Sequence, residues 1–346
     1  MLKPFKILLY PLSIAYGLIM RVRNHLYNIG YKKEISFEVM TIGVGNLAMG
    51  GSGKTPMTEY LIRLLKDKFK MAVLSRGYGR QSSGIKMVNK EDTVRTIGDE
   101  PMQVFRKFGN DVVVAVGENR LLAIPKILEG NPAVNLIVLD DIYQHRKVKP
   151  ALNLLLTNYS SPFYRDLIFP AGWLREPRQS ANRADAIIVS KCPTTMDGFE
   201  METVKASIRK YSQAPVFFSS LKYDKPVPFG ASADISDSVV LVSAIANNHL
   251  FRSHCASVFN IIKHFAFGDH HFFSDQEIHT VAVFAKANGA SIITTEKDMV
   301  KLIEQKQFIE SWPWFFLPIS IFFLNNEADL HGMILEKART LHATQN

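Results

Sequence analysis

Residues 37–57, which read FEVMTIGVGNLAMGGSGKTPM, decide the fold. The stretch begins as an apolar run typical of a buried strand and passes through a glycine-rich turn into residues with helical spacing. A strand, a glycine-rich turn and a helix that opens with Lys54-Thr55 are the parts of a phosphate-binding loop. In such a loop backbone N–H groups surround the phosphates, lysine reaches the β- and γ-phosphates, and threonine binds Mg²⁺.

The loop itself is expected to hold a nucleoside triphosphate through Ala48, Met49, Gly50, Gly51, Ser52, Gly53, Lys54 and Thr55. The general pattern begins with glycine where this chain has Ala48, but two further glycines supply backbone freedom inside the loop. A guanine-reading motif after a later strand would be Asn-Lys-x-Asp, whereas residues 190–193 read SKCP. The sequence therefore favours ATP over GTP.

The rest of the chain repeats the order of strand, turn and helix. Nearly continuous apolar runs recur in DVVVAVG, NLIVLDD, ALNLLLTN and ADAIIVSK. Such runs are typical of parallel strands that helices cover on both faces. We predict an α/β fold, with a P-loop NTPase-like doubly wound sheet domain and a second, smaller α/β domain. The expected segments are an N-terminal helical segment at 1–30, the nucleotide-binding domain at 31–222, a linker at 223–237 and the smaller domain at 238–346.

The composition limits the cellular setting. Of 346 residues 47% are hydrophobic, and the net charge is +9. This charge suits nucleic acid, a phosphate-bearing metabolite or an anionic membrane surface. Cys192 and Cys255 are the two cysteines, and their wide separation argues against a metal knuckle or a disulfide framework. A reducing cytosolic compartment fits this usage.

The N-terminus carries an uncharged run from Ile7 to Met20 between flanking lysines and arginines. As a helix this run would span roughly 21 Å, which is short of the roughly 30 Å hydrocarbon core of a bilayer. The cationic flanks favour a helix that lies on the membrane surface. A buried core helix and a true membrane span are the alternatives.

Two acidic turns are candidate parts of the site. Asp140 and Asp141 end an apolar run, and Asp140 is expected to bind Mg²⁺ together with Thr55. Asp141 is then surplus, and it indicates either a base for an acceptor hydroxyl, a carboxylate that positions water, or a helix cap. Asp99 and Glu100 form the second turn, which either reaches the metal or caps the following helix.

Taken together, the motifs resemble the tetraacyldisaccharide 4'-kinases, the lipid A 4'-kinases of Gram-negative envelope synthesis. The segments that match lie in the family's order from about residue 40 to about residue 302: GNLAMGGSGKTP, LSRGYGR, GDEP, LDDIYQHR, PAGWLREP, RADAIIVSK, FGDHHFF and TTEKDMVKL. Jointly they are far more specific than the phosphate-binding loop, which alone indicates only an NTPase.

The resemblance implies an activity and its partners. It implies ATP- and Mg²⁺-dependent phosphorylation of the 4'-hydroxyl of a tetraacylated glucosamine disaccharide 1-phosphate. The enzyme would work as a peripheral or monotopic protein at the cytoplasmic face of the bacterial inner membrane. The implied partners are this glycolipid and the membrane surface, and not nucleic acid. The implied architecture is two α/β domains with the active site in the cleft between them.

The resemblance also assigns roles to single residues. It implies that Asp141 is the catalytic base and that His270 assists it, although His270 alone would equally suggest a metal ligand or a core histidine. The metal ligands it implies are Thr55, Asp99, Glu100 and Asp140. The residues expected near phosphates or substrate are Arg76, Arg120, Gln144, His145 and Arg175. Residues 296–298, which read EKD, match a further family motif without an assigned role.

One departure from the family pattern follows the aspartate pair. The family has Gly-Phe there, whereas this chain has Ile142-Tyr143. A β-branched residue is penalised where the backbone needs a positive φ, so the turn either does not need that conformation or holds the aspartate differently.

The function we expect is direct in-line transfer of the γ-phosphate of ATP to the sugar hydroxyl. A membrane-associated P-loop ATPase with a regulatory or transport role is the alternative.

Overall fold

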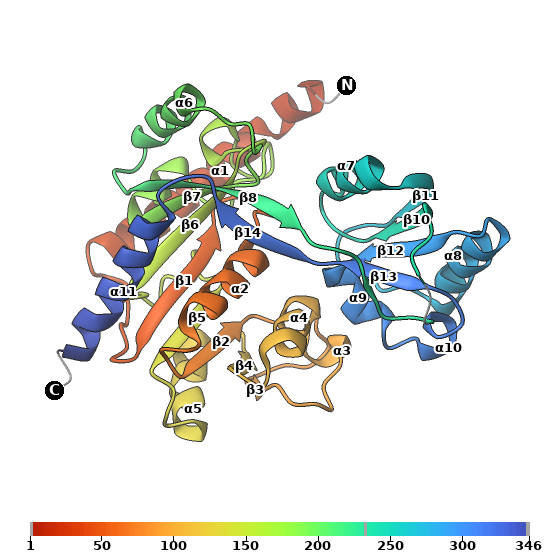
Figure 1. Cartoon of the computed structure of the whole chain (residues 1–346). Helices are drawn as coiled ribbons and strands as arrows, with labels where there is room; N and C mark the ends of the chain where they lie inside the picture. Colours follow the sequence, from red (N-terminus) through yellow and green to blue (C-terminus); the bar gives the residue numbers. More distant parts are fainter. Residues whose placement is uncertain (1–2, 232–233, 344–346) are drawn as a thin grey trace. The chain divides into compact units, whose positions relative to one another are not determined.

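A computed structural model describes residues 3–231 and 234–343 of the chain (Figure 1). Two compact units make up the chain. The first comprises Met1–Arg76, Asn110–Leu221 and Ile321–Asn346, and the second comprises Gly77–Gly109 and Lys222–Ser320.

This division differs from the expected one at both ends of the second unit. Residues 77–109, expected in the nucleotide-binding domain, belong to the second unit, and the segment from residue 321 returns to the first. Within the second unit, Lys107 forms an ion pair of 2.7 Å with Glu296. The C-terminal helix buries Leu330, Ile334 and Ala338. Residues 232–233 of the expected linker lie outside the described part of the chain.

The first unit is built on a sheet with the strand order β14-β8-β7-β6-β1-β5-β2-β4. The pairs from β8 through to β4 are parallel. Its strands are β1 (Met40–Asn46), β2 (Met71–Ser75), β4 (Val113–Val116), β5 (Leu136–Asp140), β6 (Leu152–Asn158), β7 (Ala186–Ser190), β8 (Val216–Tyr223) and β14 (Ile319–Phe323). The chain crosses between the units within β8 and within β14. Since parallel strands end at one edge, the loops after β1, β5, β6 and β7 meet there.

Helices connect these strands. They are α1 (Lys3–Asn28), α2 (Lys54–Leu65), α5 (Arg120–Gly130), α6 (Gly198–Arg209) and α11 (Glu327–Ala343), with short 3₁₀ turns at Phe163–Arg165 and Arg178–Arg183. The central strands β1, β2, β5 and β7 are buried along their whole length. The nearly continuous apolar runs therefore predicted these strands correctly.

The second unit has its own, five-stranded sheet with the order β11-β10-β12-β13-β9. Its strands are β9 (Val227–Pro228), β10 (Ser238–Ser243), β11 (Asn260–Ala266), β12 (Ser291–Thr295) and β13 (Trp314–Leu317). The short strand β3 (Lys86–Met87) also lies in this unit, together with helices α3 (Val94–Ile97), α4 (Asp99–Phe108), α7 (His249–Val258), α8 (Asp275–Ala287), α9 (Glu296–Leu302) and α10 (Lys306–Ile309). Only β9 runs antiparallel to its neighbour among the pairs described. The expected fold class, a P-loop-like sheet with a second α/β domain, is confirmed.

Helix α1 is bound to the first unit along one side only. Ser13 and Tyr27 are buried, and the Tyr16 hydroxyl donates to the backbone carbonyl of Arg175 at 2.9 Å. On its other side the exposed fractions of Leu12, Leu18 and Ile19 are 59%, 59% and 65%, and Leu8, Ile14 and Val22 are exposed as well. In the part of the chain that the structure describes, every helix falls short of the length and hydrophobicity that a membrane span requires.

Candidate active site

The loop between β1 and α2 has the backbone of a phosphate-binding loop. Gly50 and Gly53 have φ angles of 101° and 85°, which other residues adopt only at a steric cost. Gly53 directly precedes α2 and no side chain caps the helix, so the first N–H groups of α2 are directed toward an incoming anion. Lys54 and Thr55 are the first two residues of that helix. The structure thus brings the expected loop residues together around one anion-binding position.

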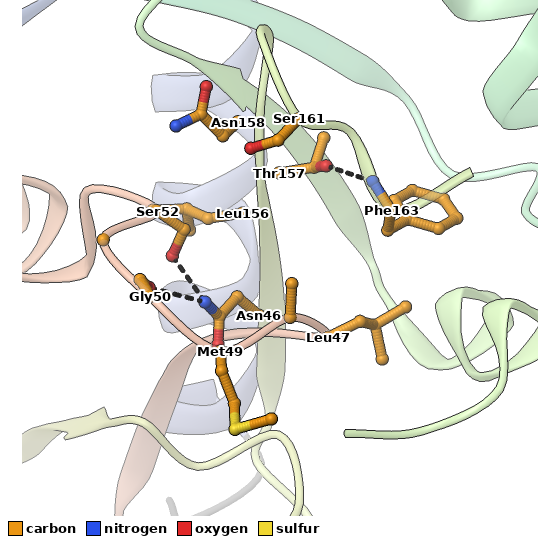
Figure 2. A pocket seen from close by; sticks show the side chains of 12 residues that line it. Asn46, Leu47, Met49, Gly50, Ser52, Leu156, Thr157, Asn158, Ser161 and Phe163 are labelled. Atoms are coloured by element: carbon orange, nitrogen blue, oxygen red, sulfur yellow. Dashed lines mark hydrogen bonds between the residues drawn. The ribbon is translucent and has the colours of Figure 1, made fainter. Parts of the chain in front are cut away.

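A hollow lies beside this loop on the side of β6. It is lined by residues 46–52 of the loop and by the end of β6 with the turn that follows it, including Asn158, Ser161 and Phe163 (Figure 2). Asn46 is buried and donates to the Ser52 hydroxyl at 2.8 Å, which holds the two limbs of the loop together. This role of Asn46 could not be predicted from the sequence, because a polar residue at a strand end has many uses.

Asp140 ends β5 at the same edge, next to β1 in parallel register. Its carboxylate accepts from the Ser75 hydroxyl at 3.3 Å, and its backbone carbonyl accepts from the Arg120 guanidinium at 3.1 Å. The Thr55 hydroxyl and the Asp140 carboxylate are hard oxygen donors of the kind that Mg²⁺ prefers, so the residues present fit this ion. Arg120 is 2% exposed, and its burial lowers the pKa to about 10 although Asp140 and Asp141 oppose the shift.

Asp141 is held by two cations. Arg175 donates to both of its carboxylate oxygens, at 2.8 and 3.0 Å, and Nζ of Lys54 lies 3.6 Å from Oδ1. Burial raises the pKa of Asp141, but Lys54 and Arg175 outweigh burial and keep the pKa far below its ordinary value. Arg175 also contacts the side chain and the carbonyl of Asn46, which connects Asp141 to the start of the phosphate-binding loop.

The turn after the two aspartates resolves the departure at Ile142. The residue with the positive φ is Asp141 itself, at 47°, and Ile142 is not among the positive-φ residues described. Ile142 is 2% exposed and packs over β1, where a Cβ atom on Gly43 would lie only 2.7 Å from its side chain. Isoleucine is therefore compatible with the turn, and the residue with the strained backbone is Asp141.

The other residues expected at the substrate also lie at this edge. The side-chain amide of Gln144 donates to the backbone carbonyl of Asn46 at 2.9 Å. The backbone carbonyl of Gln144 accepts from Arg23 of α1 at 2.7 Å. Burial, followed by the charges of Arg120 and Arg76, lowers the pKa of His145 to about 4. His145 is therefore a neutral side chain at neutral pH, within a strongly cationic surrounding.

The second unit holds a separate set of the expected residues. Asp99 is the first residue of α4, and its Oδ2 lies 2.9 Å from Nδ1 of His270. His270 has a φ of 58° and its ring lies against Tyr78, with 5.0 Å between the ring centroids. Burial raises the pKa of Asp99, but the hydrogen bond with His270 and the charge of Lys297 outweigh burial and hold the pKa below its ordinary value.

Lys297, which the sequence left without a role, lies among these acidic residues. Its Nζ is 3.7 Å from Asp99, 3.6 Å from Glu100 and 3.5 Å from Asp269. The same atom is 3.3 Å from Nε2 of His270. Burial lowers the pKa of Lys297, but Asp99 and Glu100 raise it more, so that the side chain stays a cation.

The neighbours of Lys297 serve the fold. Asp298 is fully buried, accepts from the Ala244 N–H at 2.8 Å and forms an ion pair of 2.6 Å with Lys301. His271 contacts Glu277 at 3.0 Å, and this glutamate belongs to the capping box of α8. His271 therefore supports a helix start, whereas the adjacent His270 faces the acidic turn.

Asp141 and His270, the expected catalytic pair, belong to different units, and each has partners within its own unit. Asp141 lies in the first unit with Lys54 and Arg175, and His270 lies in the second unit with Asp99. Each carboxylate has its partner within its own unit. Among the described residues no three histidine, cysteine or acidic side chains converge as metal ligands.

The comparisons with known proteins agree with this geometry. The family model described as tetraacyldisaccharide-1-P 4'-kinase matches residues 5–339. A protein of Flavobacterium johnsoniae named tetraacyldisaccharide 4'-kinase is 39% identical over 339 residues, which cover 95% of this chain and 96% of the relative. A protein of the same name from Bacteroides thetaiotaomicron is 39% identical over 342 residues and covers 93% and 90%.

A solved structure is similar along almost the whole chain. It is LpxK from Aquifex aeolicus in complex with ATP, and it is 29% identical with a TM-score of 0.76. The match covers 96% of this chain and 99% of the other. The likeness therefore extends over both units.

Proposed function

The chain belongs to the tetraacyldisaccharide-1-P 4'-kinase family, and from this premise we propose that it transfers the γ-phosphate of ATP directly to the 4'-hydroxyl of a tetraacylated glucosamine disaccharide 1-phosphate. Family membership makes the chain a kinase of lipid A biosynthesis. The donor, the acceptor atom, the in-line route and the residue roles are the proposal. The observation that carries it is the phosphate-binding loop beside Asp140 and Asp141.

ATP is the proposed donor. The Aquifex aeolicus relative was solved with ATP, and the loop of this chain has the positive-φ glycines and the open α2 N-terminus that phosphates require. Thr55 and Asp140 would hold Mg²⁺, which neutralises charge on the β- and γ-phosphates. Glu100, in the acidic turn of the second unit, is proposed as a further contact of the metal, directly or through water.

In this proposal, three cations stabilise the negative charge of the phosphoryl group during its transfer. Lys54, Arg120 and Arg175 surround the two aspartates, and the charge of the γ-phosphoryl group spreads over its oxygens during transfer. Asp141 contacts Lys54 and both arms of the Arg175 guanidinium. Its proposed role is to keep these two cations aimed at the γ-phosphate, because a carboxylate tied to two cations is a poor proton acceptor.

The Asp99–His270 pair is the proposed proton acceptor. A carboxylate that orients an imidazole is the arrangement by which enzymes take a proton from an attacking hydroxyl. The hydrogen bond of 2.9 Å from Nδ1 to Asp99 directs Nε2 to the opposite side of the ring, where Nζ of Lys297 lies 3.3 Å away. This role requires the second unit to bring the pair to the bound substrates during the catalytic cycle.

The acyl chains of the acceptor place the reaction at a membrane. We propose that the exposed apolar side of α1, with Leu12, Leu18 and Ile19, lies in the interface of the inner membrane at its cytoplasmic face. Arg21, Lys32 and Lys33 are exposed near the end of this helix and suit anionic head groups. We expect no nucleic acid partner.

Acceptor dependence tests the proposal. Purified protein with γ-labelled ATP should transfer label only when the disaccharide 1-phosphate is added, and the product mass should increase by one phosphate. Equal ATP turnover with and without the acceptor would instead support a membrane-associated P-loop ATPase.

A further inference from the structure

One side of α1 is fastened to the loop that carries Arg175. Ser13 and Tyr16 lie on this side together, because residues three apart are neighbours on the surface of a helix. The Ser13 hydroxyl accepts from the backbone N–H of Ala171 at 2.8 Å, and the Tyr16 ring meets the Phe169 ring edge-on with 6.0 Å between the centroids. The Tyr16 hydroxyl donates to the backbone carbonyl of Arg175 at 2.9 Å. Helix α1 therefore holds this loop at three positions.

The same loop is also paired with the phosphate-binding loop. The N–H of Met49 donates to the carbonyl of Trp173 at 2.8 Å, and the N–H of Arg175 donates to the carbonyl of Leu47 at 2.7 Å. The backbone of Arg175 is thus bonded to the phosphate-binding loop through its N–H and to α1 through its carbonyl. A helix with an exposed apolar side is in this way connected to a cation of the candidate active site.

The guanidinium of Arg175 depends on this backbone for its position. Its two terminal nitrogens bond to Asp141 and Asn46, whereas its buried Nε has no hydrogen-bond partner among the described residues. The planar fork of an arginine makes paired contacts with phosphate oxygens only when it is aimed correctly. When phosphate oxygens compete with Asp141 for the fork, the backbone of Arg175 is the remaining fixed point.

We propose that Tyr16 is a positioning residue for phosphoryl transfer, which holds the backbone of Arg175 so that the guanidinium points at the γ-phosphate. This role rests on the proposed action of Arg175 on the transferring group, and it adds a residue of the N-terminal helix to that site. Burial and then the charge of Glu176 raise the pKa of Tyr16, so the hydroxyl remains a donor at neutral pH. Arg23, about two turns further along α1, supports the site similarly, because it donates to the backbone carbonyl of Gln144 at 2.7 Å.

A double-mutant cycle tests this role by steady-state kinetics of the full chain with labelled ATP and the disaccharide acceptor in vesicles. Tyr16→Phe removes only the hydroxyl. It should lower kcat roughly three- to tenfold, the size expected for one lost hydrogen bond, and leave KM for ATP and for the acceptor within about twofold. Arg175→Ala should lower kcat by about 10²-fold or more. Adding Tyr16→Phe to Arg175→Ala should cause no further loss, because the hydroxyl acts through the arginine. Tyr31→Phe, which removes a hydroxyl at an exposed position after α1, is the matched control and should keep the wild-type kcat.

Several results would overturn the positioning role. A wild-type kcat in Tyr16→Phe would show that Arg175 needs no such support, and an equal loss in the wild-type and Arg175→Ala backgrounds would show that the hydroxyl acts elsewhere. A raised KM for the acceptor with unchanged kcat would assign Tyr16 to lipid binding instead. Unchanged kcat in Arg175→Ala would refute the proposed action of Arg175 and the role of Tyr16 with it. Absence of acceptor-dependent transfer in the wild type would instead refute the proposed function itself.

Discussion

His270 and Asp99 lie 171 residues apart in sequence, and yet Nδ1 of the histidine is 2.9 Å from a carboxylate oxygen of the aspartate. The fold makes this contact by passing residues 77–109 to the second unit, where α4 packs beside α9. Asp141, the neighbour of the proposed metal ligand Asp140, instead forms ion pairs with Lys54 and Arg175. In the proposed mechanism, proton acceptance and phosphate positioning belong to different carboxylates.

The first prediction concerns this division of roles. Asp99→Asn and His270→Gln should each lower kcat by about 10²- to 10⁴-fold, the range expected for loss of general-base catalysis. Affinity for ATP should stay near the wild-type value, because neither residue lies in the phosphate-binding loop. The measurement is kcat with labelled ATP and the disaccharide acceptor, together with calorimetric ATP binding.

Two further variants serve as controls for this assignment. His271→Gln should keep kcat within a few-fold, because His271 contacts Glu277 at the start of α8. Asp141→Asn should lower kcat while the acid limb of the pH–rate profile keeps its midpoint. Loss of that limb in Asp141→Asn alone would return the role of base to Asp141.

The second prediction concerns the attachment of α1. Arg146 donates to Glu34 at 2.7 Å and to the Asn24 carbonyl at 3.0 Å, and its guanidinium lies over the Tyr27 ring. Arg146→Met should reduce the free energy of unfolding by about 2–4 kcal/mol, because a mostly buried set of charge-assisted hydrogen bonds is lost. Lys147→Met, at the exposed neighbouring position, should change it by less than about 0.5 kcal/mol. Urea unfolding measures both, and equal effects would refute the anchoring role.

The third prediction is the pH dependence of stability that His145 causes. Its pKa in the folded chain is about 4, against an ordinary value of 6.5, with burial as the main cause. Between these values the unfolded chain binds a proton that the folded chain does not, so stability falls as the pH decreases from 6.5 to 4. At pH 5 the free energy of unfolding is lower by about 2 kcal/mol than at pH 7.5.

Urea unfolding at pH 7.5 and pH 5 checks the contribution of His145. His145→Gln should lose less stability than the wild type over this interval, whereas His25→Gln, at an exposed position of α1, should follow the wild type. An identical loss in the wild type and in His145→Gln would show that other groups dominate the acid side.

The fourth prediction concerns the membrane surface. Ile19→Glu places a charge on the exposed apolar side of α1, so it should reduce binding to vesicles that contain anionic lipid while leaving the melting temperature unchanged. Glu38→Gln, at an exposed position outside the helix, should bind vesicles like the wild type. Vesicle co-sedimentation measures this, and unaltered binding of Ile19→Glu would exclude this side of the helix.

Local sequence predicted the central strands of the first sheet and the nucleotide loop. The loop, its helix and the strand-end Asp140 are consecutive or follow one buried strand, so spacing alone locates them. The family and the fold class inferred from the motifs are confirmed. The isoleucine at position 142, where the family has glycine, does not strain the turn, because the positive φ belongs to Asp141.

Contacts that depend on long-range topology were not predictable from the sequence. Nothing local indicates that residues 77–109 belong to the second unit, so the contact between Asp99 and His270 was not expected. Lys297 had a motif but no role, because its neighbours come from two separate segments, at residues 99–100 and 269–270. Lys191 resembled only a failed guanine motif until its contact with Gly51 was visible.

Transfer of labelled γ-phosphate to the tetraacylated disaccharide 1-phosphate in anionic vesicles, with the mass and position of the product determined, tests the proposed kinase activity most directly. We expect one phosphate at the 4'-hydroxyl per ATP consumed, and almost no ATP consumption without the acceptor. ATP consumption that is independent of the acceptor, or a product phosphorylated elsewhere, would contradict it.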